Sequence, residues 1–390
     1  MRNLEKLRAD TPGCAHRIHL NNAGSALPPA PVLQAMQKHL ELEARIGGYE
    51  AADQAAADIA GFYDAVARLL NTRSRNIAFV ASATDAYARA LSAVDWQAGD
   101  VILSTENDYV SNQIAFLSLQ KRFQIQLLRA RDQPEGGVDV ADMERLIRER
   151  RPRLVAVTHV PTNSGLVQPV EEIGRICRAA GVWYLVDACQ SAGQMPLDVE
   201  RINCDFLSAT MRKFLRGPRG AGFLYVSDRV LDAGLELLLP DMRSANWTGP
   251  DTYDPAPDAR RFEYWEMPPA LTLGSKVAIE YALGIGLDKI ESRVRRLADL
   301  TRRLLATLPG VRVLDQGRDL CGIVTAHHPA WHSKTLMEWM SQRGINVRTS
   351  PLYVAQIDFP RKGVEWALRI SPHYYNTEEE IERAVRAIPL

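Results

Sequence analysis

Apolar, β-rich runs alternate with helical stretches through most of the chain. The predicted strands lie at residues 77–80, 101–103, 125–128, 154–158, 182–186, 206–209 and 222–226. Several of them are continuously apolar, which is typical of strands that are covered on both faces. Helical patterns lie between them at residues 30–44, 85–94, 140–150 and 170–180. This alternation predicts an α/β fold in which helices wrap a mostly parallel sheet.

The pattern changes near residue 240. Residues 240–269 are rich in Pro, Asp and aromatic residues, which predicts an extended, irregular segment. A long helical stretch follows at residues 269–308 and is expected to break near Gly284 and Gly286. Short strand patterns at 311–314, 322–326, 346–348 and 367–371 then alternate with helical patterns at 334–343 and 377–388. The C-terminal part therefore predicts a smaller α/β domain.

Composition and charge exclude several classes of protein. The chain has 390 residues, of which 46% are hydrophobic and 24% are charged, the balance of a globular protein. At about 100–200 residues per domain, this length corresponds to two or three domains. Basic and acidic residues both number 47, so no net charge drives binding to nucleic acid or to an anionic membrane. No apolar run approaches the roughly 20 residues of a membrane span.

The N-terminus and the cysteines indicate the cellular compartment. The first residues contain no apolar core, so they are not a secretory signal. The 5 cysteines are odd in number, widely spaced and without a CxxC pair, which indicates neither a disulfide framework nor a metal site. We expect a cytoplasmic protein with reduced thiols.

Three loops follow apolar strands, at the sheet edge where open parallel sheets bind ligands. The first comprises residues 81–86, whose small side chains include Ala83 and Thr84. Backbone N–H groups at such a strand-to-helix turn can bind a phosphate, which the helix dipole also favours. The alternative is a plain helix N-cap by Ser82 or Thr84.

The second and third loops carry an acid and an amine. Asp187 ends an apolar strand, where a carboxylate is costly unless a cation, such as a protonated heteroaromatic nitrogen, pairs with it. A helix N-cap or a structural salt bridge would also explain this residue. Lys213 lies between a strand and a Gly/Pro-rich turn. Its amine can form a Schiff base where burial or cations such as Arg212 and Arg216 disfavour its charged form, unless the loop is merely a basic surface.

Arg369 interrupts an apolar strand pattern near the C-terminus. Arginine is suited to hold a carboxylate through two parallel hydrogen bonds, although a structural ion pair is an alternative. Each of these signals is weak alone. Together, a phosphate turn, an Asp and a Lys on loops of one sheet, with an Arg in a smaller domain, match what pyridoxal phosphate requires.

These motifs resemble those of fold-type I pyridoxal-phosphate enzymes of the class V aminotransferase/cysteine desulfurase superfamily. Residues 187–190 resemble the family's Asp-x-x-Gln, residues 210–213 its Ser-Gly-His-Lys, and residues 368–371 with 375–377 its C-terminal signature. The resemblance covers nearly the whole chain, from about residue 20. It implies a mostly parallel seven-stranded sheet in a large domain at residues 21–265. A small domain at 266–390 and an N-terminal segment at 1–20, packed on the small domain, would complete the fold.

The resemblance implies roles for residues around the cofactor. Lys213 would bind pyridoxal 5′-phosphate covalently and later move the Cα proton of the substrate. Asp187 would keep the ring nitrogen protonated, and Gln190 would hydrogen-bond the phenolic oxygen. Tyr109 would stack on the ring. The residues that would hold the phosphate are Ala83, Thr84, Thr210 and Arg212.

The same resemblance implies a binding site for an amino-acid substrate. Arg369 would bind the substrate carboxylate, with Arg348 close by. Asn163 matches an Asn near that carboxylate, although Thr162 is an alternative, and Asn22 matches an N-terminal loop that folds over the substrate.

Two departures from the family pattern bear on the reaction. Cysteine desulfurases place a persulfide-accepting Cys in the loop after Arg348, where this chain has Tyr353 and no cysteine follows Cys321. A sulfur relay needs a thiolate there, so desulfurase activity by that route is disfavoured. Arg212 and Met211 replace the His and Gly of many relatives, and the Arg brings a permanent positive charge to the phosphate.

A narrower resemblance suggests the reaction. Residues 212–220 and 261–266 resemble the isopenicillin N epimerase-like group, which includes hercynylcysteine sulfoxide lyases. We therefore expect a C–S lyase that cleaves a cysteine thioether or sulfoxide by β-elimination. An epimerase or racemase needs a second acid on the opposite ring face, near which Tyr109 would lie, and an aminotransferase would release a keto acid. A non-catalytic binding or regulatory module is a remote alternative, because Lys213, Asp187 and Arg369 are all present.

The expected assembly is the family's homodimer, in which the neighbour completes each active site. Tyr253, Trp265 and residues 261–266 are candidates for reaching across, and a plain surface hairpin is the alternative. Neither nucleic acid nor a membrane is an expected partner.

Overall fold

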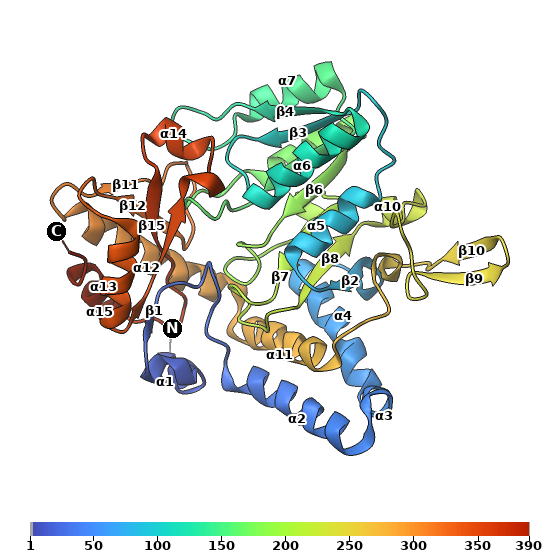
Figure 1. Ribbon diagram of the computed structural model, residues 1–390, viewed down its shortest axis with the longest axis horizontal. Coiled ribbons are helices and arrows are strands. Elements are labelled where there is room, and N and C mark those ends of the chain that lie inside the picture. The colour runs from blue at the N-terminus through green and yellow to red at the C-terminus, as the bar shows by residue number, and fades with distance from the viewer. Residues whose placement is uncertain (1–2, 390) are drawn as a thin grey trace.

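The computed structural model describes residues 3–389 and shows a large and a small domain (Figure 1). The strands of the large domain are β2 (Ile77–Val80), β3 (Val101–Thr105), β4 (Gln126–Ala130), β5 (Leu154–Thr158), β6 (Trp183–Asp187), β7 (Phe206–Thr210) and β8 (Gly222–Val226). They form a 7-stranded sheet of order β2-β8-β7-β6-β5-β3-β4, in which β8 is antiparallel to both neighbours and the other pairs are parallel. The predicted strands and their mostly parallel arrangement are confirmed.

Helices cover both faces of this sheet. Along β5, Val155 and Val157 pack into one core, whereas Leu154 and Ala156 pack into the other. The first core draws on α2 (Ala30–Ile46), α4 (Ala56–Leu70), α7 (Val140–Arg150), α8 (Val170–Ala180) and α11 (Pro269–Ile285). The second draws on α5 (Ala83–Ser92), α6 (Val110–Phe123) and α10 (Asp228–Asp232). Burial on both faces explains why the strand sequences are continuously apolar.

Some helices of the large domain left no clear pattern in the sequence. The shorter ones are α3 (Gly48–Gln54), α9 (Val199–Ile202) and the 3-10 turns η2 (Ser74–Asn76) and η3 (Ala259–Phe262). The sequence pattern did not predict α3, α4 or α6. In α6 the buried residues are Asn112 and Phe116, so this helix has no apolar stripe to detect.

The small domain carries its own antiparallel sheet. The sheet has the order β11-β12-β15-β14, with β11 (Arg312–Val313), β12 (Val324–His327), β14 (Arg348–Pro351) and β15 (Trp366–Ile370). Its helices are α12 (Leu287–Ala306), α13 (Ser333–Gln342), α14 (Asp358–Lys362), α15 (Glu378–Arg386) and the turn η4 (Leu352–Val354). The N-terminal segment contains α1 (Leu4–Ala9), η1 (Pro12–Ala15) and β1 (Ile18–His19). Strand β1 pairs with β13 (Ile345–Asn346), so this segment lies against the C-terminal part of the chain.

The two domains meet where the predicted long helix breaks. The chain bends by 80° between α11 and α12, and Gly286 between them has φ +93°, a conformation that favours glycine. Helix α11 packs against α2 and α4, whereas α12 packs against α15. No single helix among residues 3–389 is long and apolar enough to cross a membrane, and α11 with α12 meets that test only as a bent pair.

The segment that the sequence predicted to be irregular contains a hairpin. Strands β9 (Ala245–Gly249) and β10 (Thr252–Pro255) pair antiparallel and project from the large domain (Figure 1). The side chains of this hairpin are largely exposed, and Trp247 is 82% exposed.

Candidate active site

The chemistry-bearing loops meet at one edge of the large sheet. Strand β2 is antiparallel to β8, which is antiparallel to β7, so β2 and β7 run in the same direction as β6. Their carboxyl ends therefore lie at the same edge, as in other open α/β sheets that bind ligands. A cavity of about 300 Å³ lies there. It is lined by Ala81, Ser82, Ala83, Thr84, Tyr109, Asn112, Asp187, Cys189, Thr210, Arg212, Lys213, Arg219 and Gly220.

Lys213 projects its amine into this cavity. Its Nζ atom lies 3.2 Å from Cys189 Sγ and 5.8 Å from the centre of the Tyr109 ring. The side chain is buried, and no carboxylate among residues 3–389 forms an ion pair with it. Its amine therefore faces a thiol and an aromatic ring and is free to react with a carbonyl.

Asp187 is held in place from two sides. The Cys189 backbone N–H donates to Asp187 Oδ1 over 2.8 Å, and Asn112 Nδ2 donates to Oδ2 over 3.1 Å. Burial raises the pKa of Asp187, while these hydrogen bonds and the Lys213 charge oppose that shift. Asn112 also donates to Asp108 and to Thr158, so a buried polar network fixes the Asp187 carboxylate behind the cavity. No sequence motif singled out Asn112, although it lies one helical turn after Tyr109.

The opposite end of the cavity is suited to an anion. It is formed by the N-terminus of α5, where Ala83 and Thr84 contribute backbone N–H groups. Ser82 caps this helix by accepting a hydrogen bond from the Asp85 N–H over 3.1 Å. The N-cap that the sequence offered as an alternative is therefore present, and it leaves the N–H groups of Ala83 and Thr84 available to an anion. Arg212 lines the same cavity and donates to the Gly24 carbonyl, and Arg219 adds a second cation.

Arg216 does not take part in this site. It is 1% exposed and donates to the Leu27 carbonyl, to Thr11 Oγ1 and to the Tyr374 hydroxyl. The expectation that it acts on Lys213 is therefore corrected: this guanidinium ties the N-terminal segment to the large domain.

Two small structural features shape the Lys213 loop. Gly193 has φ +90°, and a Cβ atom there would lie 2.5 Å from the Leu215 backbone nitrogen, so only glycine allows the Asp187 and Lys213 loops to approach. Met211 is fully buried in the core beneath the turn and faces Gly217, where a Cβ atom would meet it at 2.9 Å. Met211 thus fills the space under the loop.

A second cavity of about 670 Å³ adjoins the first and shares Tyr109, Arg212 and Lys213 with it. Arg369 lies in its wall and is 7% exposed. Its guanidinium donates to Thr162 Oγ1 over 2.6 Å and to Asn21 Oδ1 over 3.2 Å, and no acid among residues 3–389 pairs with it. A buried cation with only neutral partners is a strong binding site for a carboxylate.

Thr162 and Asn21, rather than the adjacent Asn163 and Asn22, are the residues that contact Arg369. Thr162 Oγ1 also accepts from Gln190 Nε2 over 2.8 Å, whereas Asn163 donates to Asn107 and to Asp358. Of the two candidates left open by the sequence, the geometry brings Thr162 to Arg369.

Asn22 also points away from the cavity. Its amide donates to the Ser371 carbonyl over 2.7 Å, and its oxygen accepts from the Tyr375 hydroxyl over 2.5 Å. Asn21, the residue before it, is the one that reaches Arg369.

The donor set fits pyridoxal phosphate. One end offers Arg212, Arg219 and a helix N-terminus to a phosphate, and the other offers the Asp187 carboxylate to a ring nitrogen. Between them lie the Lys213 amine and the Tyr109 ring. The buried Gln190 Oε1 atom has no hydrogen-bond partner among residues 3–389, which marks a polar position suited to a bound group.

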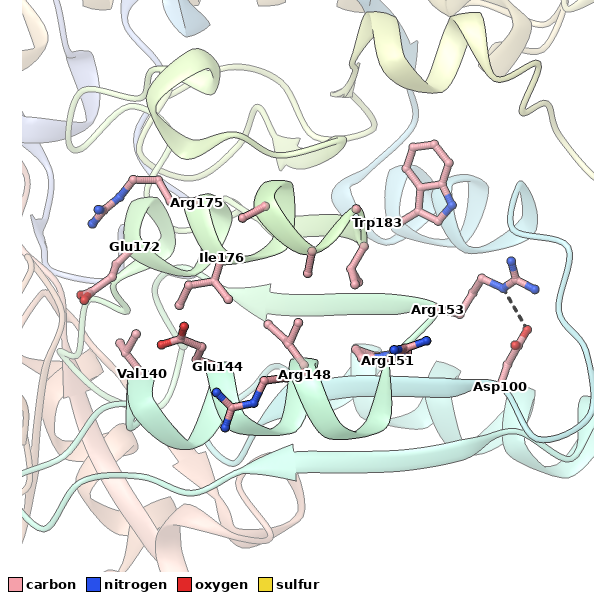
Figure 2. Close-up of a pocket in the computed structure, with 16 residues that line it drawn as sticks. Asp100, Val140, Glu144, Arg148, Arg151, Arg153, Glu172, Arg175, Ile176 and Trp183 are labelled. Atoms are coloured by element: carbon pink, nitrogen blue, oxygen red, sulfur yellow. Dashed lines mark hydrogen bonds and ion pairs between the residues drawn. The ribbon is translucent and has the colours of Figure 1, made fainter.

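A larger groove of about 1010 Å³ lies between α7 and α8, at the other edge of the same sheet (Figure 2). Strand β6 begins at Trp183 in this groove and ends at Asp187 in the site. Arg148 and Arg151 border the groove and are exposed. Since parallel sheets bind ligands at the carboxyl ends of their strands, we place the chemistry in the cavity at Lys213.

Comparison with known proteins identifies the family of this chain. Residues 18–384 match the family model described as aminotransferase class-V. A probable cysteine desulfurase of Pyrococcus abyssi is 29% identical, over 98% of this chain and 96% of that protein. A probable cysteine desulfurase of Methanothermobacter thermautotrophicus is 28% identical, over 97% and 95%. These relatives support the superfamily, but not the narrower resemblance to the isopenicillin N epimerase-like group.

Solved structures agree on the fold. The apo cysteine desulfurase of Thermococcus onnurineus NA1 has a TM-score of 0.90 and 26% identity, and the match covers 98% of this chain and 96% of that one. The cystine C–S lyase C-DES, in complex with cysteine persulfide, has a TM-score of 0.84 at 24% identity over 96% and 98%, which shows the fold alone. The chain belongs to the class V aminotransferase family and is a pyridoxal-phosphate enzyme that acts on an amino acid.

Proposed function

We propose that this enzyme is a C–S lyase that cleaves a cysteine thioether or sulfoxide by β-elimination. The observation that carries the proposal is the side chain in the loop after Arg348. Tyr353 lies there, 68% exposed, where the resemblance to cysteine desulfurases implies a sulfur-accepting cysteine. A tyrosine cannot accept sulfur as a thiolate does. The sulfur fragment is therefore released rather than passed to the protein.

Each residue of the site has a task in such a reaction. Pyridoxal phosphate, when bound, supplies an electron sink for negative charge at the substrate's Cα. Arg369 orients the substrate by its carboxylate, together with Thr162 and Asn21. Asp187 holds a proton at the ring nitrogen, with Asn112 fixing the carboxylate.

Lys213 is the residue that moves the proton. Its amine lies in the cavity that adjoins Arg369, with the Tyr109 ring beside it. It takes the proton from Cα, after which the Cβ–S bond breaks and its electron pair leaves on sulfur. The three-carbon fragment yields pyruvate and ammonia on hydrolysis.

The test is a panel of cysteine thioethers and sulfoxides with the holoenzyme. We expect pyruvate, ammonia and one sulfur fragment in equal amounts. Incorporation of solvent deuterium at Cα with loss of chirality, and no keto acid, would establish an epimerase instead. Turnover that requires an added keto acid would establish an aminotransferase. A biological effect that survives Lys213→Ala would favour a binding module.

Desulfuration of free cysteine is a second candidate, because the relatives compared are named as cysteine desulfurases. The thiol that could receive sulfur is Cys189, 3.2 Å from Lys213 Nζ. Burial raises the pKa of Cys189, although Lys213 opposes the shift. Formation of alanine from cysteine, together with a cyanolysable persulfide on the protein, would support this candidate. Loss of that persulfide in Cys189→Ala would show that Cys189 carries the sulfur.

We also propose that the enzyme is a homodimer in which the hairpin of β9 and β10 contacts a second copy. The large exposed side chains Trp247 and Tyr253 on a projecting hairpin support this arrangement. Sedimentation of the protein and of Trp247→Ser tests it, since weakened association is expected only if the hairpin lies in the interface.

A further inference from the structure

Two arginines of the small domain lie directly opposite each other. Strands β14 and β15 are antiparallel, and in their register Arg348 pairs with Arg369. Like charges at directly opposed positions destabilise a sheet. The Arg348 charge also lowers the pKa of Arg369, next to the larger effect of burial. Burial makes Arg369 the costly member of the pair, whereas Arg348 is exposed and water screens part of its charge.

The described part of the chain supplies no anion to this pair. Among residues 3–389, Arg348 has neither a hydrogen bond nor an ion pair with an acid, and Arg369 has only neutral partners. The cavity that both arginines line contains one acid, Glu338, which pairs with Lys334 at 4.0 Å.

Arg348 is the arginine of this cavity to which neither the phosphate nor the substrate's α-carboxylate has been assigned. Arg212 and Arg219 line the end of the neighbouring cavity that suits the phosphate, and Arg369 is placed for the α-carboxylate of the substrate. Arg348 has no such assignment. It lines the same cavity as Met337, Pro351 and Tyr353.

We infer that Arg348 selects a substrate with a second carboxylate, carried on the thioether substituent that leaves with sulfur. This inference rests on the proposed lyase function and names its substrate class. The second carboxylate pairs with Arg348, while the methylene groups between it and sulfur pack against Met337 and Tyr353. The two anions of one substrate then neutralise the opposed arginines.

The test compares S-carboxyethyl-L-cysteine with its amide, S-carbamoylethyl-L-cysteine, which has nearly the same shape without the charge. For the holoenzyme we expect kcat/KM for keto-acid release to favour the acid by at least about 10-fold. In Arg348→Gln this ratio should fall to within about twofold of one. The matched control is Lys334→Gln, which removes another cation from the same cavity. Because Lys334 is 89% exposed and already pairs with Glu338, its removal should leave the ratio within about twofold of wild type.

Other outcomes would overturn the inference. A wild-type ratio near one would do so, as would an equal loss for both compounds in Arg348→Gln, which would mean that both arginines hold the same α-carboxylate. If neither compound gives a keto acid, the proposed lyase reaction is wrong. The relative affinities of the two compounds, measured from their effect on the cofactor absorption band, then still decide whether Arg348 recognises the second charge.

Discussion

Strand β6 connects two arginine-lined hollows of very different character. At its first residue, Trp183, it borders the groove between α7 and α8, where Arg148, Arg151 and Arg175 are exposed beside Glu144 and Glu172 (Figure 2). At its last residue, Asp187, it enters the cavity at Lys213.

The arginines differ in their surroundings rather than in number. In the groove, Arg153 pairs with Asp100 at 3.2 Å, and arginines at the C-terminal end of α7 interact favourably with the helix dipole. Arg369 is buried and has no acid partner among residues 3–389. Water and neighbouring acids satisfy the first group, whereas only a ligand can satisfy the second. Unmatched buried charge, and not the size of a hollow, marks the functional site.

The largest effect is expected from Lys213→Ala. It removes the amine that binds the cofactor and moves the proton, so the rate of C–S cleavage should fall by at least about 1000-fold. Borohydride treatment should also fail to fix the chromophore to the protein. A variant that retains more than one tenth of the activity would contradict the role of Lys213.

Asp187→Asn should lower kcat by about 100-fold, because an amide cannot hold a proton at the ring nitrogen as a carboxylate does. The absorption band of the bound cofactor should shift at the same time. Asn112→Ala, which removes the hydrogen bond to Asp187 Oδ2 together with those to Asp108 and Thr158, should have a smaller effect in the same direction. Unchanged absorption spectra in both variants would contradict the contact between Asp187 and the ring nitrogen of the cofactor.

Arg369→Gln should raise KM by about 10-fold to 100-fold with a smaller change in kcat, since a charge-assisted hydrogen-bond pair to the substrate carboxylate is lost. Arg369→Lys should recover only part of the loss, because lysine lacks the planar pair of donors. If KM is unaffected, the buried guanidinium serves the structure alone.

Acid should destabilise the fold through His159, which follows β5 and donates its backbone N–H to the Asp187 carbonyl over 2.9 Å. Burial lowers the pKa of His159 to about 4, below its usual value of 6.5. Between these values the unfolded state binds the proton and the folded state does not, so stability falls as pH drops from 6.5 toward 4. The loss is about 2 kcal/mol at pH 5.

Urea unfolding of wild type and His159→Gln at pH 7 and pH 5 measures this contribution. The drop in stability between the two pH values should be smaller in the variant, and His16→Gln, at an exposed position, should behave as wild type. An equal drop in all three proteins would assign the acid sensitivity to other groups.

The smallest effect is expected in the groove. Arg148→Gln and Arg175→Gln should leave kcat/KM within about twofold of wild type and change the free energy of unfolding by no more than about 0.5 kcal/mol, because both side chains are exposed. A tenfold loss of activity would show that the groove communicates with the site.

The sequence by itself determined the alternation of strands and helices, and with it the sheet edge at which Asp187 and Lys213 meet. Apolar runs and the small residues of the turns are local features, and the direction of successive parallel strands follows from the connections between them. The motifs that contain Asp187 and Lys213 are short stretches of consecutive residues, so the sequence was sufficient to predict the cofactor.

Only the tertiary structure decided which neighbour faces the cavity. Asn21 rather than Asn22 and Thr162 rather than Asn163 reach Arg369, which is far away in the sequence. Arg216 turns instead toward the N-terminal segment. Adjacent side chains on a loop point in different directions, and their orientation is set by packing between the two domains and by the partners that satisfy each buried polar group.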